Sequence, residues 1–236
     1  MYVELVANPR HYKILWDALK GTMDSQERHF ETLQEKYIYE LSYNMGKITG
    51  SFIGRIILLE EALLTKTEEL NRDHTTQLLN SVAIERRGDE WVKQQKPFVA
   101  VFFDLLNFKK INDIHGHTNG NQYLQDIGDI LVKVTKNIDL VARIGGDEFL
   151  ILLDTQQATE EPSHIAHSVI DRTRRYVNGY NSMNYPELHH LGISGGYAIY
   201  DPEMHPTLSS VISEADISMS LNKKQQHTEN GGAYRV

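Results

Sequence analysis

The sequence of 236 residues contains no cysteine, which excludes a disulfide framework and thiolate chemistry and favours a cytoplasmic location. Its first residues lack the basic start and apolar core of a secretory signal, so we do not expect export. The most apolar stretch, Ile48 to Leu64, contains Arg55, Glu60 and Glu61. It falls short of the roughly 18 uncharged residues that a membrane helix needs. We therefore expect no membrane span in this chain.

Basic residues are also scarce, with 24 Lys and Arg against 32 Asp and Glu and a formal net charge of −8. No block of basic residues offsets this balance, and affinity for a nucleic-acid backbone comes mainly from clustered Lys and Arg. The sequence therefore argues against a general DNA or RNA binder, while a single nucleotide held by a metal ion and a few lysines stays open. Hydrophobic residues at 40% and aromatic residues at 9% are typical of a globular chain.

Residues 1–72 are rich in helix formers and show no strand-like alternation. We interpret them as an all-helical signalling and dimerisation segment with a long helix from about Ser25. Apolar residues of this helix alternate at spacings of three and four, which is typical of a coiled coil: Met45, Phe52, Ile56, Leu59, Leu63 and Leu70. Glycines at every fourth position, from Gly46 to Gly54, either admit a second helix closely or merely loosen this one. The seam predicts a homodimer through the N-terminal helices.

Residues 73–236 have a different character, because β-rich runs alternate with helical runs. We expect strands at 97–104, at 140–154 as a hairpin around Gly145 and Gly146, and at 191–200. Helical spacing occurs over 119–138, 160–180 and 207–224. The order βαββαβ predicts an α+β domain whose sheet is packed by helices on one face.

Two acidic positions are candidates for chemistry. Asp104 ends the first strand, and Asp147 with Glu148 follows the hairpin turn. If the first strand and the hairpin are adjacent, Asp104 and Asp147 converge, and two close carboxylates repel unless a cation lies between them. Such hard oxygen ligands suit Mg²⁺, or Mn²⁺, carrying the phosphates of a nucleotide. The alternative, which spacing alone leaves open, is that Asp147 is an ordinary turn residue and Asp104 simply ends a strand.

Several segments resemble one family in the right order and at the right spacing. RIGGDEF at 143–149 resembles the signature of the GGDEF family, the diguanylate cyclases. FFDLLNFKKINDIHGHTNG at 102–120 is similar to the strand and loop segment of that family, and DHTTQLLN at 73–80 and ADISMSLNKK at 215–224 are similar to its opening and closing segments. The resemblance covers roughly 73–236. It implies a nucleotidyl-cyclase-like fold and the condensation of two GTP into cyclic di-GMP with release of pyrophosphate.

The resemblance also implies roles for individual residues. The metal site would consist of three carboxylates and one backbone carbonyl, from Asp104, Asp147, Glu148 and Leu105. Glu148 would assist the metal or help to deprotonate the attacking ribose 3′-hydroxyl. The nucleotide would be bound by amides, ammonium groups, a glycine turn and a base-reading amide: Asn107, Phe108, Lys109, Lys223, Gly145, Gly146 and Asn112.

Some positions depart from the pattern of the family. Leu106 replaces a second Asp before the FK motif, and Asn121 replaces the Asp that usually reads guanine. The opening segment has Thr75, Gln77 and Ser81 in place of Leu, Gly and Arg, and the closing helix lacks the usual GRNR stretch. The alternatives to an active cyclase are therefore a degenerate nucleotide-binding or scaffold domain, a promiscuous cyclase that also makes cyclic GMP-AMP, and a helical sensor whose cyclase domain only reports.

The product-inhibition motif of the family, RxxD, is also altered. Its positions here run from Lys136 to Asp139. Lysine keeps the positive charge but cannot make the planar bidentate contact that arginine makes with a guanine edge or a phosphate. We expect feedback inhibition by the product to be weak or absent.

Overall fold

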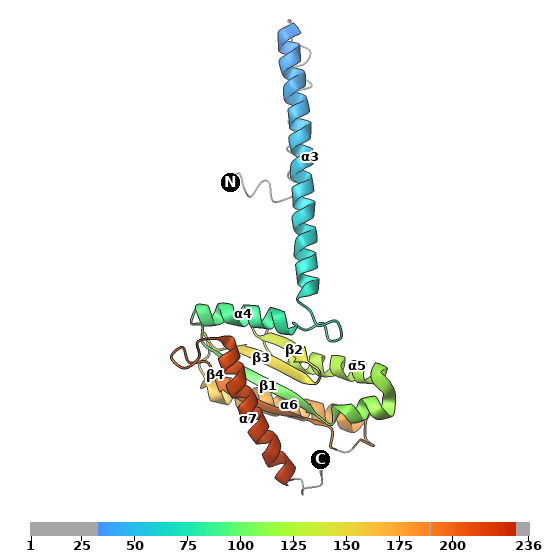
Figure 1. Ribbon diagram of the computed structural model, residues 1–236, viewed down its shortest axis with the longest axis vertical. Coiled ribbons are helices and arrows are strands. Elements are labelled where there is room, and N and C mark those ends of the chain that lie inside the picture. Colours follow the sequence, from blue (N-terminus) through green and yellow to red (C-terminus); the bar gives the residue numbers. More distant parts are fainter. Residues whose placement is uncertain (1–32, 189, 230–236) are drawn as a thin grey trace. The chain divides into compact units, whose positions relative to one another are not determined.

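The computed structural model describes residues 33–188 and 190–229. The chain divides into two compact units, 1–70 and 71–236, which we describe separately (Figure 1). In the first unit, helix α3 spans Leu33–Leu70, so the predicted start near Ser25 lies outside the described residues. Its seam side chains Phe52, Ile56 and Leu59 are exposed, at 66%, 41% and 68%.

The second unit is built on one antiparallel sheet of four strands in the order β2-β3-β1-β4. The elements in chain order are α4 (Ser81–Lys93), β1 (Phe98–Leu106), α5 (Phe108–Val134), β2 (Leu140–Gly145), β3 (Glu148–Asp154), α6 (Pro162–Asn184), β4 (Gly192–Ile199) and α7 (Leu208–Glu229). From β1 to β4 this order is βαββαβ, which confirms the predicted fold class. Helix α4, which the sequence analysis did not predict, precedes the first strand.

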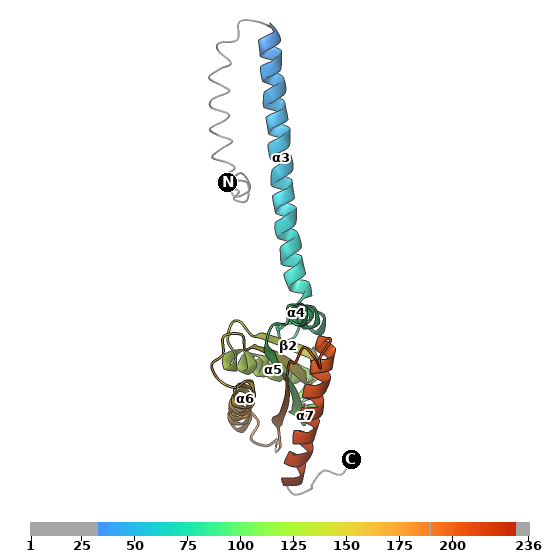
Figure 2. The ribbon, with the colours of Figure 1, turned by 90° about the vertical axis from the view of Figure 1, so that its left-hand side faces the viewer.

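Helices cover both faces of the sheet, so the prediction of a single covered face was wrong. Alternate residues of β1, such as Val101 and Phe103, pack with α5 and α6, while the residues between them, such as Ala100 and Phe102, pack with α4 and α7. Figures 1 and 2 show the sheet between these two helix layers. The reason is visible in β1 itself, because a strand buried on both faces is apolar at almost every position.

Helix α5 begins eleven residues earlier than its predicted start at 119, because the segment after β1 is already helical. The break that the sequence suggested is a kink at Gly116, where φ is +81° and ψ is 164°. This left-handed φ is strained for any residue with a side chain. The chain therefore turns sharply at Gly116 and places residues on the two halves of α5 near each other.

Helix α7 lies directly against β4, and a glycine permits this close approach. A Cβ atom built on Gly196 would lie 1.9 Å from the backbone nitrogen of Met219. The Asn222 side chain then donates a hydrogen bond to the carbonyl of Gly195 (2.9 Å). These contacts fix the part of α7 that carries Lys223.

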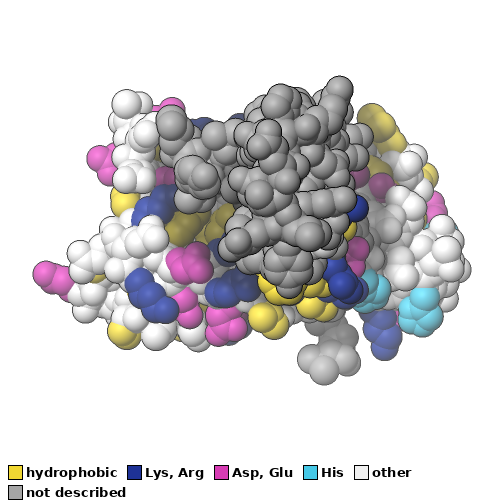
Figure 3. Space-filling view, turned by 90° about the horizontal axis from the view of Figure 1, so that it is seen from above, with side chains coloured by type: hydrophobic (Ala, Val, Ile, Leu, Met, Phe, Trp, Pro, Cys, Tyr) yellow, Lys and Arg dark blue, Asp and Glu magenta, His cyan; other side chains and the backbone are white. Residues whose placement is uncertain are grey.

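On the face shown in Figure 3, basic and acidic side chains of the described residues are interspersed. This mixture is typical of an ordinary solvated surface rather than of a basic surface that binds a nucleic-acid backbone. None of the helices in the described part of the chain has the length and apolarity needed to cross a membrane.

Candidate functional site

The end of β1 and the start of β3 bring the predicted carboxylates together. In the antiparallel register, Asp104 lies opposite Glu148. The backbone N–H of Leu105 donates to the carbonyl of Asp147 (3.1 Å), which ties the hairpin turn to the end of β1. One corner of the sheet therefore contains Asp104, Leu105, Asp147 and Glu148.

The electrostatic environment of this corner disfavours charge on its carboxylates. Burial raises the pKa of Asp104, and the charges of Asp147 and Asp216 add to this effect against the opposing influence of Lys223. Burial also raises the pKa of Glu148, followed by the charges of Asp104, Asp147 and Asp216. Such mutual repulsion is relieved when a cation binds between the carboxylates.

A cation from the protein already lies against Asp104. The ammonium group of Lys223, from α7, is 2.6 Å from Asp104 Oδ1. Lys223 was predicted to hold nucleotide phosphates. The structure places its ammonium group at the carboxylate corner, paired with Asp104.

The residues present suit a divalent metal ion by donor type, since carboxylate and carbonyl oxygens are the ligands that Mg²⁺ prefers. Burial, together with the neighbouring acidic side chains, raises the pKa values of Asp104 and Glu148, and a bound cation would oppose this shift. However, no group of three or more acidic or histidine side chains has metal-binding geometry among residues 33–188 and 190–229. The predicted set of three carboxylates is therefore not assembled in this conformation.

The predicted phosphate-binding residues lie where β1 passes into α5. Asn107 has a left-handed φ of +61° and makes no side-chain cap to α5; its amide group donates instead to the carbonyl of His190 (2.7 Å). The ring of Phe108 stacks on Tyr123 in the core, with centroids 6.1 Å apart. Lys109 is exposed. The side chains of Asn107 and Phe108 are thus engaged within the protein, which leaves their backbone amides and the exposed Lys109 side chain for a ligand; amides at a helix N-terminus are suited to phosphate.

The hairpin turn between β2 and β3 is open above its glycines. Gly146 has a φ of +51°, which favours glycine on backbone grounds alone. Gly145 has an ordinary φ, and a Cβ atom there would meet nothing within 4 Å. Packing inside the described chain therefore does not require glycine at position 145, which is consistent with space reserved for a ligand.

The predicted base-reading residues lie on the two sides of the kink in α5. A Cβ atom on Gly120 would lie 1.9 Å from Asn112 Oδ1, so the Asn112 side chain rests on that glycine. Asn121, the next residue, is exposed. Asn112 and Asn121 are therefore brought to the same region, although they are nine positions apart in the sequence.

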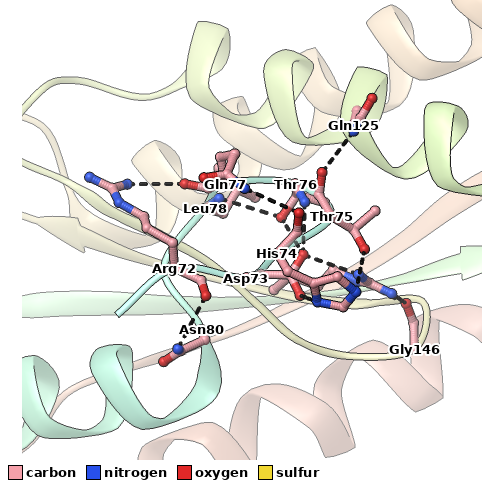
Figure 4. A network of polar contacts seen from close by, with 11 residues as sticks. Arg72, Asp73, His74, Thr75, Thr76, Gln77, Leu78, Asn80, Gln125 and Gly146 are labelled. Carbon is pink, nitrogen blue, oxygen red and sulfur yellow. Dashed lines mark hydrogen bonds and ion pairs between the residues drawn. The ribbon is translucent and has the colours of Figure 1, made fainter. Parts of the chain in front are cut away.

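A polar network that the sequence analysis missed links the opening segment to the hairpin turn (Figure 4). Arg143 donates to the Gly146 carbonyl from Nε (3.0 Å) and from Nη2 (2.7 Å), and Nη1 lies 3.1 Å from Asp73 Oδ1. The same carboxylate oxygen accepts from the backbone N–H and the hydroxyl of Thr76, each at 2.8 Å. One arginine thus holds the carbonyl next to Asp147.

Burial alone would raise the pKa of Asp73, but the hydrogen bonds from Thr76 and the Arg143 guanidinium outweigh it and hold the pKa below its usual value. Both partners are largely buried, with side-chain exposures of 15% for Asp73 and 12% for Arg143. The signals for this network were present in the sequence, as Asp73 and Arg143 are the first residues of two of its recognised segments.

The residues at the product-inhibition motif form a turn between α5 and β2. Asp139 accepts hydrogen bonds from the backbone N–H groups of Lys136 (2.7 Å) and Asp154 (3.0 Å). Lys136 and Arg172 line a neighbouring hollow of about 300 Å³. The Asp139 carboxylate is therefore already engaged in holding the turn.

Comparison with known proteins identifies the family. Residues 70–229 match the model of the GGDEF domain, described as a diguanylate cyclase domain. The chain therefore belongs to the GGDEF family, the family of the diguanylate cyclases.

Individual relatives agree with this assignment. The chain is 28% identical over 213 residues to the probable diguanylate cyclase DgcE of Escherichia coli, covering 84% of this chain and 18% of DgcE. It is 29% identical over 202 residues to diguanylate cyclase A of Treponema denticola, covering 84% of this chain and 51% of the relative. The chain thus spans only part of the length of these relatives.

The fold is also similar to a solved structure of the coiled coil and GGDEF domain of DgcB from Caulobacter crescentus, in complex with c-di-GMP. The TM-score is 0.62 at 21% identity, over 78% of this chain and 95% of that one. At this identity the likeness establishes the fold alone.

Proposed function

We propose that the chain is a diguanylate cyclase that joins two GTP molecules into cyclic di-GMP and releases two pyrophosphates. The observation that carries this proposal is that Asp104, Asp147 and Glu148 lie at the same corner of the sheet, where Lys223 contacts Asp104. Acidic side chains at this corner, in a member of the GGDEF family, are the type of group that metal-assisted condensation requires.

The reaction consists of two equivalent displacements. In each, the 3′-oxygen of one ribose bonds to the α-phosphorus of the other GTP, and the bond from that phosphorus to the pyrophosphate oxygen breaks. The hydroxyl proton is accepted by Glu148 or by water next to it. A bound Mg²⁺ or Mn²⁺ ion would neutralise the phosphates in line with the general chemistry of phosphoryl transfer. Asp104, Asp147 and the Leu105 carbonyl would hold this ion, with Glu148 assisting.

The nucleotide would lie across the hairpin turn. Backbone amides of Asn107 and Phe108, together with Lys109 and Lys223, would bind the β- and γ-phosphates. Ribose and α-phosphate would rest over Gly145 and Gly146, where the structure leaves open space. Asn112 and Asn121 would then face the edge of the guanine.

One domain offers one such site, whereas the reaction joins two nucleotides. We therefore include a homodimer in the proposal, formed through α3, whose apolar seam is exposed in the single chain. An apolar stripe of this length is seldom left in contact with water. The helical segment would then bring two domains face to face and pass on a signal whose nature no motif reveals.

Feedback by the product is expected to be weak. Lys136 lacks the bidentate geometry of arginine, and the Asp139 carboxylate is occupied by two backbone N–H groups. Saturating cyclic di-GMP should therefore leave the initial rate nearly unchanged.

The second candidate is a nucleotide-binding or scaffold domain without turnover. The incomplete metal geometry and the departures at Leu106 and Asn121 favour it. The two candidates are separated by measuring Mg²⁺-dependent GTP binding and dinucleotide formation on the same preparation. GTP binding accompanied by dinucleotide formation supports the cyclase, provided that Asp147→Ala abolishes the dinucleotide formation. Binding of equal strength without any dinucleotide supports the scaffold, and a mixed product from GTP plus ATP identifies a promiscuous cyclase.

A further inference from the structure

Strand β4 carries a buried hydroxyl group without a partner, next to the carboxylate corner. Ser194 is 0% exposed, and its Oγ atom has no hydrogen-bond partner in the described part of the chain. A buried hydroxyl that stays unpaired has lost its hydration without compensation. Such groups are rare in native proteins and call for an explanation, of which a role at a functional site is one.

The register of the sheet places Ser194 directly beside Asp104. The two residues are partners in the β1–β4 ladder, so their side chains leave the sheet on the same face. Side chains paired in this way have Cβ atoms about 5 Å apart. The next pair on that face is Phe102 with Gly196, and Gly196 is the residue that meets α7. Ser194 and Asp104 therefore both project toward the helix that carries Lys223.

The hydroxyl of Ser194 can reach the carboxylate by one rotation about χ1, since a serine side chain has three staggered positions. Within the described residues, the hydrogen bond that Asp104 accepts comes from Lys223, to Oδ1. A divalent cation and the Lys223 ammonium cannot both lie against this carboxylate without strong repulsion. When the cation binds there, Asp104 loses the donor that fixes its orientation.

We propose that Ser194 is a positioning residue for Asp104. Its hydroxyl donates to the Asp104 carboxylate when a divalent cation takes the place of the Lys223 ammonium, and it holds one oxygen so that the other faces the cation. Lys223 is then released toward the phosphates of the nucleotide. This inference rests on the proposed function, because it requires metal binding at Asp104. Groups that orient metal ligands in this way commonly matter as much as the ligands themselves.

The test measures Mn²⁺ binding in the presence of a non-hydrolysable GTP analogue. The concentration of free Mn²⁺ is monitored by electron paramagnetic resonance. Ser194→Ala should raise the Mn²⁺ dissociation constant by about tenfold. Its metal-free unfolding temperature should be equal to or above that of the wild type, because the substitution removes an unpaired hydroxyl. Excess Mg²⁺ should restore the maximal rate. Thr173→Val is the matched control, because it removes a buried hydroxyl that has a partner, the Val169 carbonyl, on the opposite face of the sheet.

The outcomes separate this inference from the cyclase assignment. Wild-type Mn²⁺ affinity in Ser194→Ala, with binding lost in Asp104→Asn, would overturn the role of Ser194 and leave the proposed function standing. A lower metal-free unfolding temperature with unchanged Mn²⁺ affinity would mark a purely structural hydroxyl and overturn it as well. Failure of the wild type itself to bind Mn²⁺ with the analogue would overturn both proposals.

Discussion

At the scale of single residues, the proposed metal-binding role of Asp104 opposes stability. Its pKa is raised by burial and by neighbouring acids, so this carboxyl group is harder to ionise in the folded state without metal than in the unfolded chain. A raised folded pKa means that the stabilising contribution is present at acid pH and is lost as the pH rises above the usual value of 3.8 and through the folded pKa. At neutral pH the charge of the Asp104 carboxylate therefore lowers the stability of the folded state, and binding of a cation would offset this loss.

We predict that Asp104→Asn lowers turnover by about 100-fold or more, because it removes a charged ligand from a site that has to neutralise phosphates. In EDTA at neutral pH the same variant should unfold at an equal or higher temperature than the wild type. Mg²⁺ with a GTP analogue should raise the unfolding temperature of the wild type only. Asp171→Asn, at an exposed position of α6, is the control. Full activity of Asp104→Asn would contradict the metal assignment.

The proposed function makes Asn121 one of two residues that would face the nucleotide base. Guanine offers two adjacent donors, N1–H and the 2-amino group, which a carboxylate accepts together, whereas Asn121 has one acceptor oxygen. A poorly paired polar group costs about 1–3 kcal/mol where water is excluded. We predict that Asn121→Asp tightens GTP binding by up to roughly tenfold, less if solvent reaches this exposed position, and strengthens rejection of ATP. Competition between GTP and ATP measures both effects, and identical selectivity in the two proteins would remove any special role for Asn121.

The sequence was informative about these residues because their neighbours in the chain carry recognisable patterns. It did not indicate Ser194 or Asp216, because each lies near Asp104 only through the folding of β4 and α7 onto β1. It also did not indicate that the Phe108 ring is turned into the core against Tyr123. Contacts between elements that are distant in the sequence depend on tertiary packing, which cannot be predicted from the spacing of residues along the chain.

At the scale of elements, the hairpin between β2 and β3 depends on Arg143. This side chain holds the Gly146 carbonyl and the Asp73 carboxylate together, and both ends are largely buried. Lysine has a single ammonium group and cannot bond both partners with the same geometry. The turn that presents Asp147 should loosen when this contact is lost.

We predict that Arg143→Lys and Asp73→Asn each lower the free energy of unfolding of the GGDEF domain by about 1–3 kcal/mol and reduce kcat more than they change KM. Because the pKa of Asp73 is held below 3.8, its contribution is present above that pH and is lost as the pH falls through the folded pKa. Wild type and Asp73→Asn should therefore become equally stable only at strongly acid pH. Urea unfolding across pH measures this, with Asp171→Asn expected to stay within about 0.5 kcal/mol. A wild-type stability profile in both variants would contradict the account.

Most elements of the second unit could be predicted from their periodicity. Strand β1 and the hairpin were recognised from apolar runs and a Gly-Gly turn, and the βαββαβ order followed. Helix α4 was missed because nearly half of its residues are charged and its buried side consists of little more than Ala83, Ile84 and Gly88. The first part of α5 was missed because its glycine and polar residues are equally typical of a loop.

At the scale of the whole molecule, the proposal requires two copies of the chain. The seam residues Ile56 and Leu59 of α3 are exposed, and so is Leu58 (66%), which lies off the seam spacing. We predict that Ile56→Glu with Leu59→Glu converts a dimer into monomers and lowers activity per subunit at low protein concentration. Leu58→Glu should leave both unchanged. Light scattering and rate against concentration measure this, and an active monomer would contradict a dimeric mechanism.

The central claim is that this chain condenses GTP. The most direct measurement is incubation of the protein with GTP and Mg²⁺, with nucleotides separated by chromatography and the product identified by its mass. The account predicts cyclic di-GMP with two pyrophosphates released per molecule, and no product from Asp147→Ala. Wild-type protein that binds GTP as a dimer yet forms no cyclic di-GMP, or an Asp147→Ala variant that forms it at the wild-type rate, would contradict the account.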